Sequence, residues 1–107
     1  MVDTQRFINK KAFQLTNYAA ALVDGIIPST EVDLYCWDTI EEWSQFTPVT
    51  LKVSPMESAF WYLLYQITFW NPKEIRTCPV LKSEVDSCID FLRGDGIYPD
   101  FCSGIRP

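Results

Sequence analysis

The side chains best suited to chemistry are carboxylates, and four of them form two pairs at helical spacing. Asp38 and Glu42 are four residues apart, as are Asp86 and Asp90, so each pair shares one face if its segment is helical. Such a pair could act as acid and base or bind a hard cation. A solvated helix face explains the same spacing more simply. We therefore predict no catalytic residue and no metal site.

Other reactive groups are scarce in this chain. Histidine is absent, which removes the commonest general base and the usual partner of a nucleophilic serine or cysteine. With four glycines and no glycine-rich phosphate loop, no nucleotide cofactor is expected. Cys78, near Lys73 and Arg76, is the cysteine best placed for reactivity, although Cys-Pro before a helix is also an ordinary turn. A small enzyme that uses Cys78 or a carboxylate pair is thus an alternative, not the preferred interpretation.

The charge of the chain is concentrated in one acidic and aromatic segment. Residues 24–57 carry seven acids and one base, for −6, whereas the residues before them sum to +2 and those after them to −1. A one-sided field of this kind attracts basic partners and repels nucleic acid and anionic lipid. Direct nucleic-acid binding would also need basic residues between the aromatic ones. We expect neither nucleic acid nor a membrane as a partner.

Aromatic side chains stand among these acids. Tyr35 and Trp37 lie beside the acids and off the apolar stripe of residues 31–45, as anchors ringed by charge do in protein interfaces. Trp43 is a weaker candidate because it also ends the apolar stripe. Aromatic residues that are merely exposed, or covered by the tail, are the alternative. The residues expected to bind a partner are Asp33, Tyr35, Trp37, Asp38, Glu41, Glu42 and Trp43.

Helices are predicted to position these residues. Apolar side chains recur every three or four positions over residues 4–23, 31–45 and 80–92, the period of an amphipathic helix. Asp3 should cap the first helix and Ser29 or Thr30 the second, while Gly25 and Gly94 should end the first and last. The first helix is expected to turn an apolar face that includes Phe13 to the core, and its opposite face, with Arg6, Lys10, Gln14 and Asn17, to water.

A further helix has the clearest start in the chain. Ser54, Pro55 and Glu57 form a capping box with proline at the first helical position. Apolar residues occupy almost the whole circumference after it, so this helix should be central and buried, or exposed to a partner. The dipeptide Asn71-Pro72 then begins a short turn or helix that Cys78-Pro79 closes.

Two segments are predicted to be non-helical. Residues 47–53 alternate Val49, Leu51 and Val53 with polar residues and proline, the period of a half-buried strand. After Gly94, glycines and prolines predict an irregular tail that lies back over the bundle. Its expected anchors are Ile97, Tyr98 and Phe101.

Length and composition favour one folded domain. A chain of 107 residues with 48% hydrophobic residues is long enough to bury one core. The first twenty residues lack a secretory signal, and the longest apolar stretch is about a third of the roughly 20 residues that span a membrane. We expect a cytoplasmic protein whose four cysteines are free, mostly buried thiols. The predicted fold is mainly α: residues 1–107 form a single domain, a compact bundle of about four helices with one short extended segment and an irregular C-terminal tail.

These features favour a non-enzymatic protein that docks its acidic, aromatic helix and the following loop onto a basic surface. Nucleases have such surfaces, and occluding one would inhibit the enzyme. In size, charge and composition the chain is similar to the small acidic immunity proteins that bacteria keep in the cytoplasm against toxin domains. That similarity implies neutralisation of a basic toxin or nuclease domain. A homo-oligomeric structural or chaperone-type protein, in which a second copy covers the apolar third helix, is the alternative, and the choice between monomer and homodimer stays open.

Overall fold

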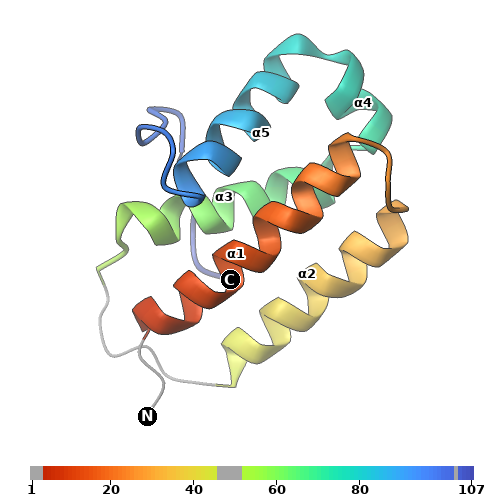
Figure 1. The fold of residues 1–107 in the computed structure, drawn as a ribbon. Helices are drawn as coiled ribbons and strands as arrows, with labels where there is room; N and C mark the ends of the chain where they lie inside the picture. The colour runs from red at the N-terminus through yellow and green to blue at the C-terminus, as the bar shows by residue number, and fades with distance from the viewer. Residues whose placement is uncertain (1–3, 46–51, 103) are drawn as a thin grey trace.

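Helices pack around one hydrophobic core in this computed structural model (Figure 1). The structure describes residues 4–45, 52–102 and 104–107. The helices are α1 (Thr4–Val23), α2 (Ser29–Ser44), α3 (Pro55–Phe69), α4 (Pro72–Thr77) and α5 (Pro79–Leu92). No described residue belongs to a strand, and the predicted mainly α class is confirmed. In the extended segment predicted over residues 47–53, residues 47–51 lie outside the described part of the chain.

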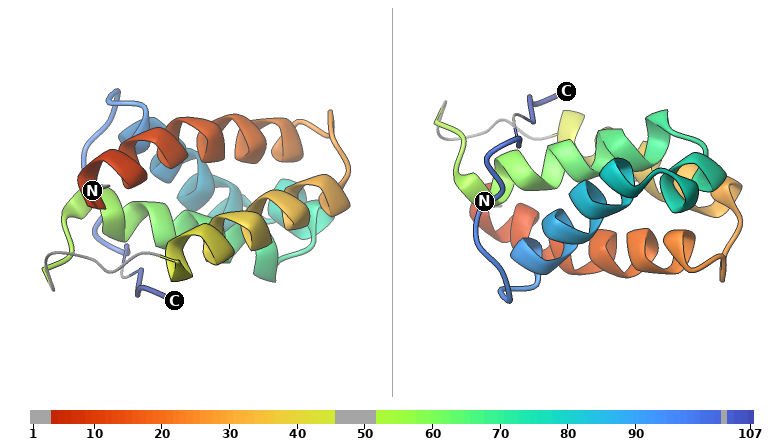
Figure 2. Two further views of the ribbon diagram at one scale, coloured as in Figure 1. Left: turned by 90° about the horizontal axis from the view of Figure 1, so that it is seen from below. Right: turned by 90° about the horizontal axis from the view of Figure 1, so that it is seen from above.

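Helix α3 lies at the centre of the bundle. Helices α1, α2 and α5 all pack against it, and α4 packs on α5 and α1. The α3 side chains Phe60, Trp61, Leu63 and Leu64 are fully buried, so of the two alternatives predicted for this apolar helix the structure shows the central, buried one. Its apolar surface is covered mainly by the chain itself, although Phe69 at its end is exposed. Helix α2 packs mainly against α1 and α3 and lies at one edge of the bundle (Figures 1 and 2).

Two glycines end the first and last helices, as predicted. Gly25 has φ +74° and Gly94 has φ +86°, a backbone conformation that L side chains rarely adopt. After α1, the Gly25 N–H donates to the Leu22 carbonyl at 3.1 Å and the next N–H donates to the Ala21 carbonyl at 2.9 Å. The same pair of bonds follows α5 at Gly94. Both helices therefore end in a glycine motif that satisfies their last carbonyls.

The helix starts agree with the sequence at α3 and differ at α2. Ser54 accepts a hydrogen bond from the Glu57 N–H at 3.1 Å, and Pro55 is the first residue of α3. At α2 the cap position is Pro28, and Ser29 is already helical. The predicted cap at Ser29 or Thr30 is therefore wrong, because the extended backbone of Pro28 lets the helix begin earlier. Asp3, the predicted cap of α1, lies outside the described residues.

Two apolar residues predicted to pack inward point to solvent instead. Phe13 is 70% exposed and Ile97 is 88% exposed, so neither contributes to the core. The apolar residues of α1 cover a wider arc of the helix than the side that is buried, and Phe13 lies outside the buried side. The buried side also includes Lys11. The tail does lie back on the bundle, but among the predicted anchors only Tyr98 and Phe101 contact it, through Phe91 and Tyr62. None of the described helices is both long and apolar enough to cross a membrane.

Candidate functional site

The inner side of α2 is an apolar stripe that fixes which residues face outward. Val32, Cys36, Thr39 and Trp43 are buried, at spacings of four, three and four residues. Side chains at these positions lie one above another on a single helix face. Positions such as 34 and 41 therefore point away from the core.

Two large apolar residues and two acids share this opposite side of α2. Leu34 is 62% exposed and Trp37 is 68% exposed, and Asp38 and Glu41 are exposed beside them. The four positions fall within eight residues at spacings of three, one and three, so their side chains are neighbours on the helix. We call Leu34, Trp37, Asp38 and Glu41 the outer surface. Among the described residues, no ion pair neutralises its two carboxylates.

Tyr35 and Asp33 lie to the side of this surface. The Tyr35 ring stacks on Tyr18 of α1 with centroids 4.3 Å apart, and its hydroxyl donates to the Lys11 carbonyl at 2.9 Å. Burial raises the pKa of Tyr35 above its ordinary value. Asp33 is half-buried. Tyr35, predicted as a partner-binding anchor, is thus already held between α1 and α2 of its own chain.

Glu42 is also engaged within the chain. Its Oε1 accepts from Lys11 Nζ at 2.6 Å, and the Lys11 side chain is almost fully covered. A buried ammonium needs such a counter-charge, because an unpaired charge away from water is costly. Glu42 therefore joins α2 to α1, and we leave it out of the outer surface.

Trp43 belongs to the core. It is 6% exposed, and its ring lies 5.6 Å from the Phe7 ring and 5.1 Å from the Trp61 ring, between centroids. The aromatic cluster holds α2 against α1 and α3. Because Trp43 is buried in this cluster, we leave it out of the outer surface.

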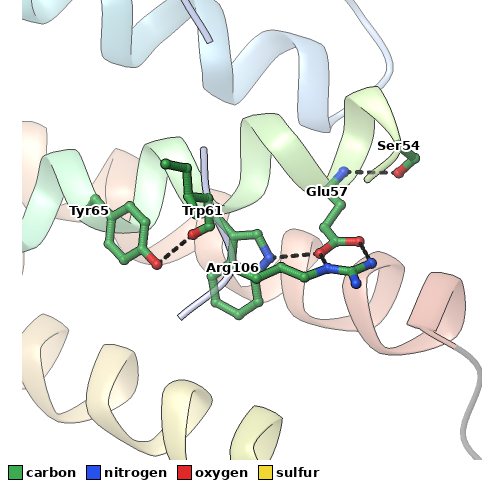
Figure 3. A network of polar contacts seen from close by, with 6 residues as sticks. Ser54, Glu57, Trp61, Tyr65 and Arg106 are labelled. Atoms are coloured by element: carbon green, nitrogen blue, oxygen red, sulfur yellow. Dashed lines mark hydrogen bonds and ion pairs between the residues drawn. The ribbon is translucent and has the colours of Figure 1, made fainter. Parts of the chain in front are cut away.

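A buried polar network on α3 was not predicted from the sequence (Figure 3). Glu57 is 2% exposed, and its carboxylate accepts from Trp61 Nε1 at 3.0 Å. Arg106, from the end of the tail, forms a two-bond ion pair with the same carboxylate, one bond being 2.8 Å from Nη2 to Oε1. The guanidinium also lies over the Trp43 ring, 5.3 Å from its centroid. The hydrogen bond to Glu57 raises the pKa of Arg106.

Sequence spacing gave no signal for this network. Glu57 reads as the third member of a capping box, and Arg106 lies 49 positions away in a tail with no periodicity. Leu34 is a different case. Its position three residues before Trp37 and seven before Glu41 marks one helix face, and that signal could have placed it on the outer surface.

Two of the groups considered for catalysis are bound by lysines of the same chain. In the two carboxylate pairs, Glu42 is bound by Lys11 and Asp86 by Lys82, the latter at 2.9 Å. The four cysteines are free thiols, three of them buried and Cys78 half-buried, as predicted. Across residues 4–45, 52–102 and 104–107, no group of three His, Cys, Asp or Glu side chains is arranged to hold a metal ion.

The chain was compared with models of protein families, with curated proteins and with solved structures. None of them matches it. The function proposed below therefore follows from the side chains on α2 and their surroundings.

Proposed function

We propose that the protein is a non-enzymatic inhibitor of the immunity type, which binds a basic toxin or nuclease domain through the outer surface of α2. The observation that carries this proposal is the exposure of Leu34 and Trp37 on a helix with five acids and no base. Protein interfaces combine apolar anchors at the centre with charges at the rim. The charge of this helix complements a basic surface and repels nucleic acid.

The two kinds of side chain on the outer surface have different tasks in this mechanism. Asp38 and Glu41 would attract lysine and arginine of the partner and so accelerate encounter. Trp37 would supply the anchor, because its ring buries a large area and its face binds a guanidinium. A nuclease needs its basic surface to bind phosphates. Covering that surface with an acidic helix would therefore inhibit it.

The side chains shared with α1 limit the size of the proposed surface. Tyr35 and Glu42 hold α1 and α2 together, and Trp43 lies in the core. Substituting these residues would disturb folding as well as binding. Leu34, Trp37, Asp38 and Glu41 are exposed, so their substitution tests the surface with little effect on the fold.

Capture from a lysate of the source organism, repeated with surface variants, tests the proposal. The wild-type protein should retain a basic protein at low salt and release it as salt rises. A Leu34→Ala/Trp37→Ala variant should lose that protein. The matched control is Phe13→Ala, which removes a similarly exposed ring from α1 and should leave capture unchanged. Equal capture by all three proteins would contradict the proposed surface.

A nuclease assay on the captured protein then tests inhibition itself. Wild-type protein added in excess should abolish cleavage, and the Leu34→Ala/Trp37→Ala variant should not. Light scattering of the protein alone distinguishes self-assembly. A dimer that depends on Trp37 would assign the outer surface to a second copy of the chain and would overturn the proposal of a basic partner.

A further inference from the structure

The C-terminal tail is seated on α3 through several close contacts. Figure 2 shows it leaving the end of α5 and crossing α3, with its last residues near the end of α2. Gly104 passes so near to α3 that a Cβ there would collide with the Ser58 carbonyl and lie 2.5 Å from the Tyr62 nitrogen. Tyr65 donates its hydroxyl to the Ile105 carbonyl at 2.7 Å. We call Cys102 and residues 104–107, which include Arg106, the strap.

A turn at the start of the strap directs Cys102 toward α5. The Cys102 N–H donates to the Pro99 carbonyl at 3.2 Å, and the Tyr98 hydroxyl donates to the Cys102 carbonyl at 2.9 Å. The Tyr98 ring in turn packs on Phe91 of α5, with centroids 5.4 Å apart. The Cys102 side chain is thereby buried beside Cys88, a fully buried residue of α5.

The sulfur atoms of Cys88 and Cys102 are 3.5 Å apart. A disulfide has a sulfur–sulfur distance of about 2.05 Å, so they need to approach by roughly 1.5 Å to bond. Cys102 lies in a turn and not in a helix, which leaves it able to make this movement. Neither Cys36 nor Cys78 has a thiol neighbour among the described residues.

We propose that Cys88 and Cys102 are a redox modification site, whose reversible disulfide joins the start of the strap to α5 and so holds the strap in place on α3. The oxidant is a low-molecular-weight disulfide such as oxidised glutathione. The Cys102 thiolate attacks one of its sulfurs and releases one reduced thiol, which takes up a proton. Cys88 then displaces the second thiol from the mixed disulfide. In balance, the protein loses two hydrogen atoms and gains one sulfur–sulfur bond, while the oxidant is cleaved to two thiols.

The surroundings of the two thiols determine the order of attack. Burial raises the pKa of both cysteines, but their mutual hydrogen bond acts in opposite directions, raising the pKa of Cys88 and lowering that of Cys102. Cys102 is therefore the better first nucleophile. Since its side chain is 8% exposed, a disulfide reagent reaches it only when the strap lifts. Opening of the strap thus sets the rate of oxidation.

Oxidation of the purified full-length chain tests the site. After treatment with oxidised glutathione, the intact protein should lose two hydrogen atoms in mass. Trypsin cuts after Lys82 and Arg93, so Cys88 and Cys102 fall on separate peptides that the disulfide should join. A Cys36→Ser/Cys78→Ser variant should give the same cross-link. A link to Cys36 or Cys78, or glutathione that stays attached without a cross-link, would overturn the proposal.

Two further measurements test whether the disulfide acts on the strap. The oxidised wild-type chain should melt about 10 °C above the reduced one, because a closed loop restricts the unfolded chain. An Arg106→Ala variant, whose strap has lost its ion pair, should be oxidised several-fold faster than wild type. A cross-link that leaves the melting temperature unchanged would refute the lock. An oxidation rate unaffected by Arg106→Ala would refute the strap's control of access.

Discussion

Two pairs of a tryptophan and a glutamate, each pair four residues apart, lie in opposite environments. They are Glu57 with Trp61, and Trp37 with Glu41. The first pair is buried on α3, with Trp61 fully covered and its Nε1 bonded to the Glu57 carboxylate. The second pair is exposed on the outer surface of α2. Helical spacing brings each tryptophan close to its glutamate. The neighbouring elements decide whether the pair completes the core or faces water.

The Glu57 carboxylate also binds a cation beside a tryptophan, but that tryptophan is Trp43 and not its pair partner Trp61. Arg106 donates two hydrogen bonds to Glu57 and covers the Trp43 ring, so charge and aromatic face act on one guanidinium. On α2 no base is present. Under the proposed function, a partner's arginine would pair with Glu41 as Arg106 pairs with Glu57, and would lie beside the exposed ring of Trp37.

The largest expected effect comes from removing the cation of the buried pair. Arg106→Ala leaves the Glu57 carboxylate buried without its counter-charge and should lower the free energy of unfolding by about 3–5 kcal/mol. Urea denaturation followed by circular dichroism measures this loss. Because the outer surface is untouched, the fraction of folded protein should still bind the partner.

A double variant separates charge from packing in this prediction. Glu57→Gln/Arg106→Met keeps an acceptor for Trp61 and removes both charges, so it should recover much of the stability that Arg106→Ala loses. If Arg106→Ala costs less than about 1 kcal/mol, in the range of an exposed ion pair, the strap is not held as the structure shows and the comparison with the outer pair fails.

The next largest effect is expected at the outer tryptophan. Trp37→Ala should weaken binding to the purified partner by about 2–4 kcal/mol, the usual cost of removing a buried anchor. The free energy of unfolding should change by less than about 0.5 kcal/mol, because the side chain is largely exposed. Titration calorimetry and urea denaturation give the two values. A loss of stability without a loss of affinity would show that Trp37, like Trp61, serves the fold and not partner binding.

The sequence predicted those features that depend on local spacing. The periodic stripes gave α1, α2 and α5, the glycines gave two helix ends, and Ser54 with Pro55 gave the start of α3. The burial and the contacts of Lys11, Trp43 and Arg106 depend on residues that are distant in the chain. Lys11 is buried only because Glu42 of α2 reaches it, and Glu57 is buried only because the tail returns with Arg106. A lone helix pattern holds no information about such partners.

A smaller effect, a dependence of stability on pH, is expected from Cys36 on the inner side of α2. Burial raises the pKa of Cys36 from 9.0 to about 12, and the charge of Asp33 adds to the shift. At a pH between these two pKa values, the Cys36 thiol of the unfolded chain releases its proton, whereas the Cys36 thiol of the folded chain keeps it. The unfolded state thus binds fewer protons, and stability falls as pH rises, by at most about 1.4 kcal/mol per pH unit for this group.

Urea denaturation under reducing conditions, from about pH 8 to about pH 10.5, tests this dependence. Burial also raises the pKa values of Tyr35, Cys88 and Cys102, so part of the decline should persist without Cys36. A Cys36→Ala variant should therefore decline less steeply than wild type. An identical slope in the two proteins would show that Cys36 ionises as freely in the folded chain as in the unfolded one.

The smallest effect on affinity is expected from the outer carboxylates, and it should appear in the association rate. Asp38→Lys/Glu41→Lys reverses the charge around Trp37 without disturbing Glu42, whose pairing with Lys11 stabilises the fold. Association with the basic partner should slow by about tenfold at low salt. The difference should shrink as salt screens the charges. Glu74→Lys, an exposed acid on α4, is the control for charge alone. If it slows association equally, the field of the whole molecule steers the partner, and Trp37 with Glu41 is not the counterpart of the buried pair.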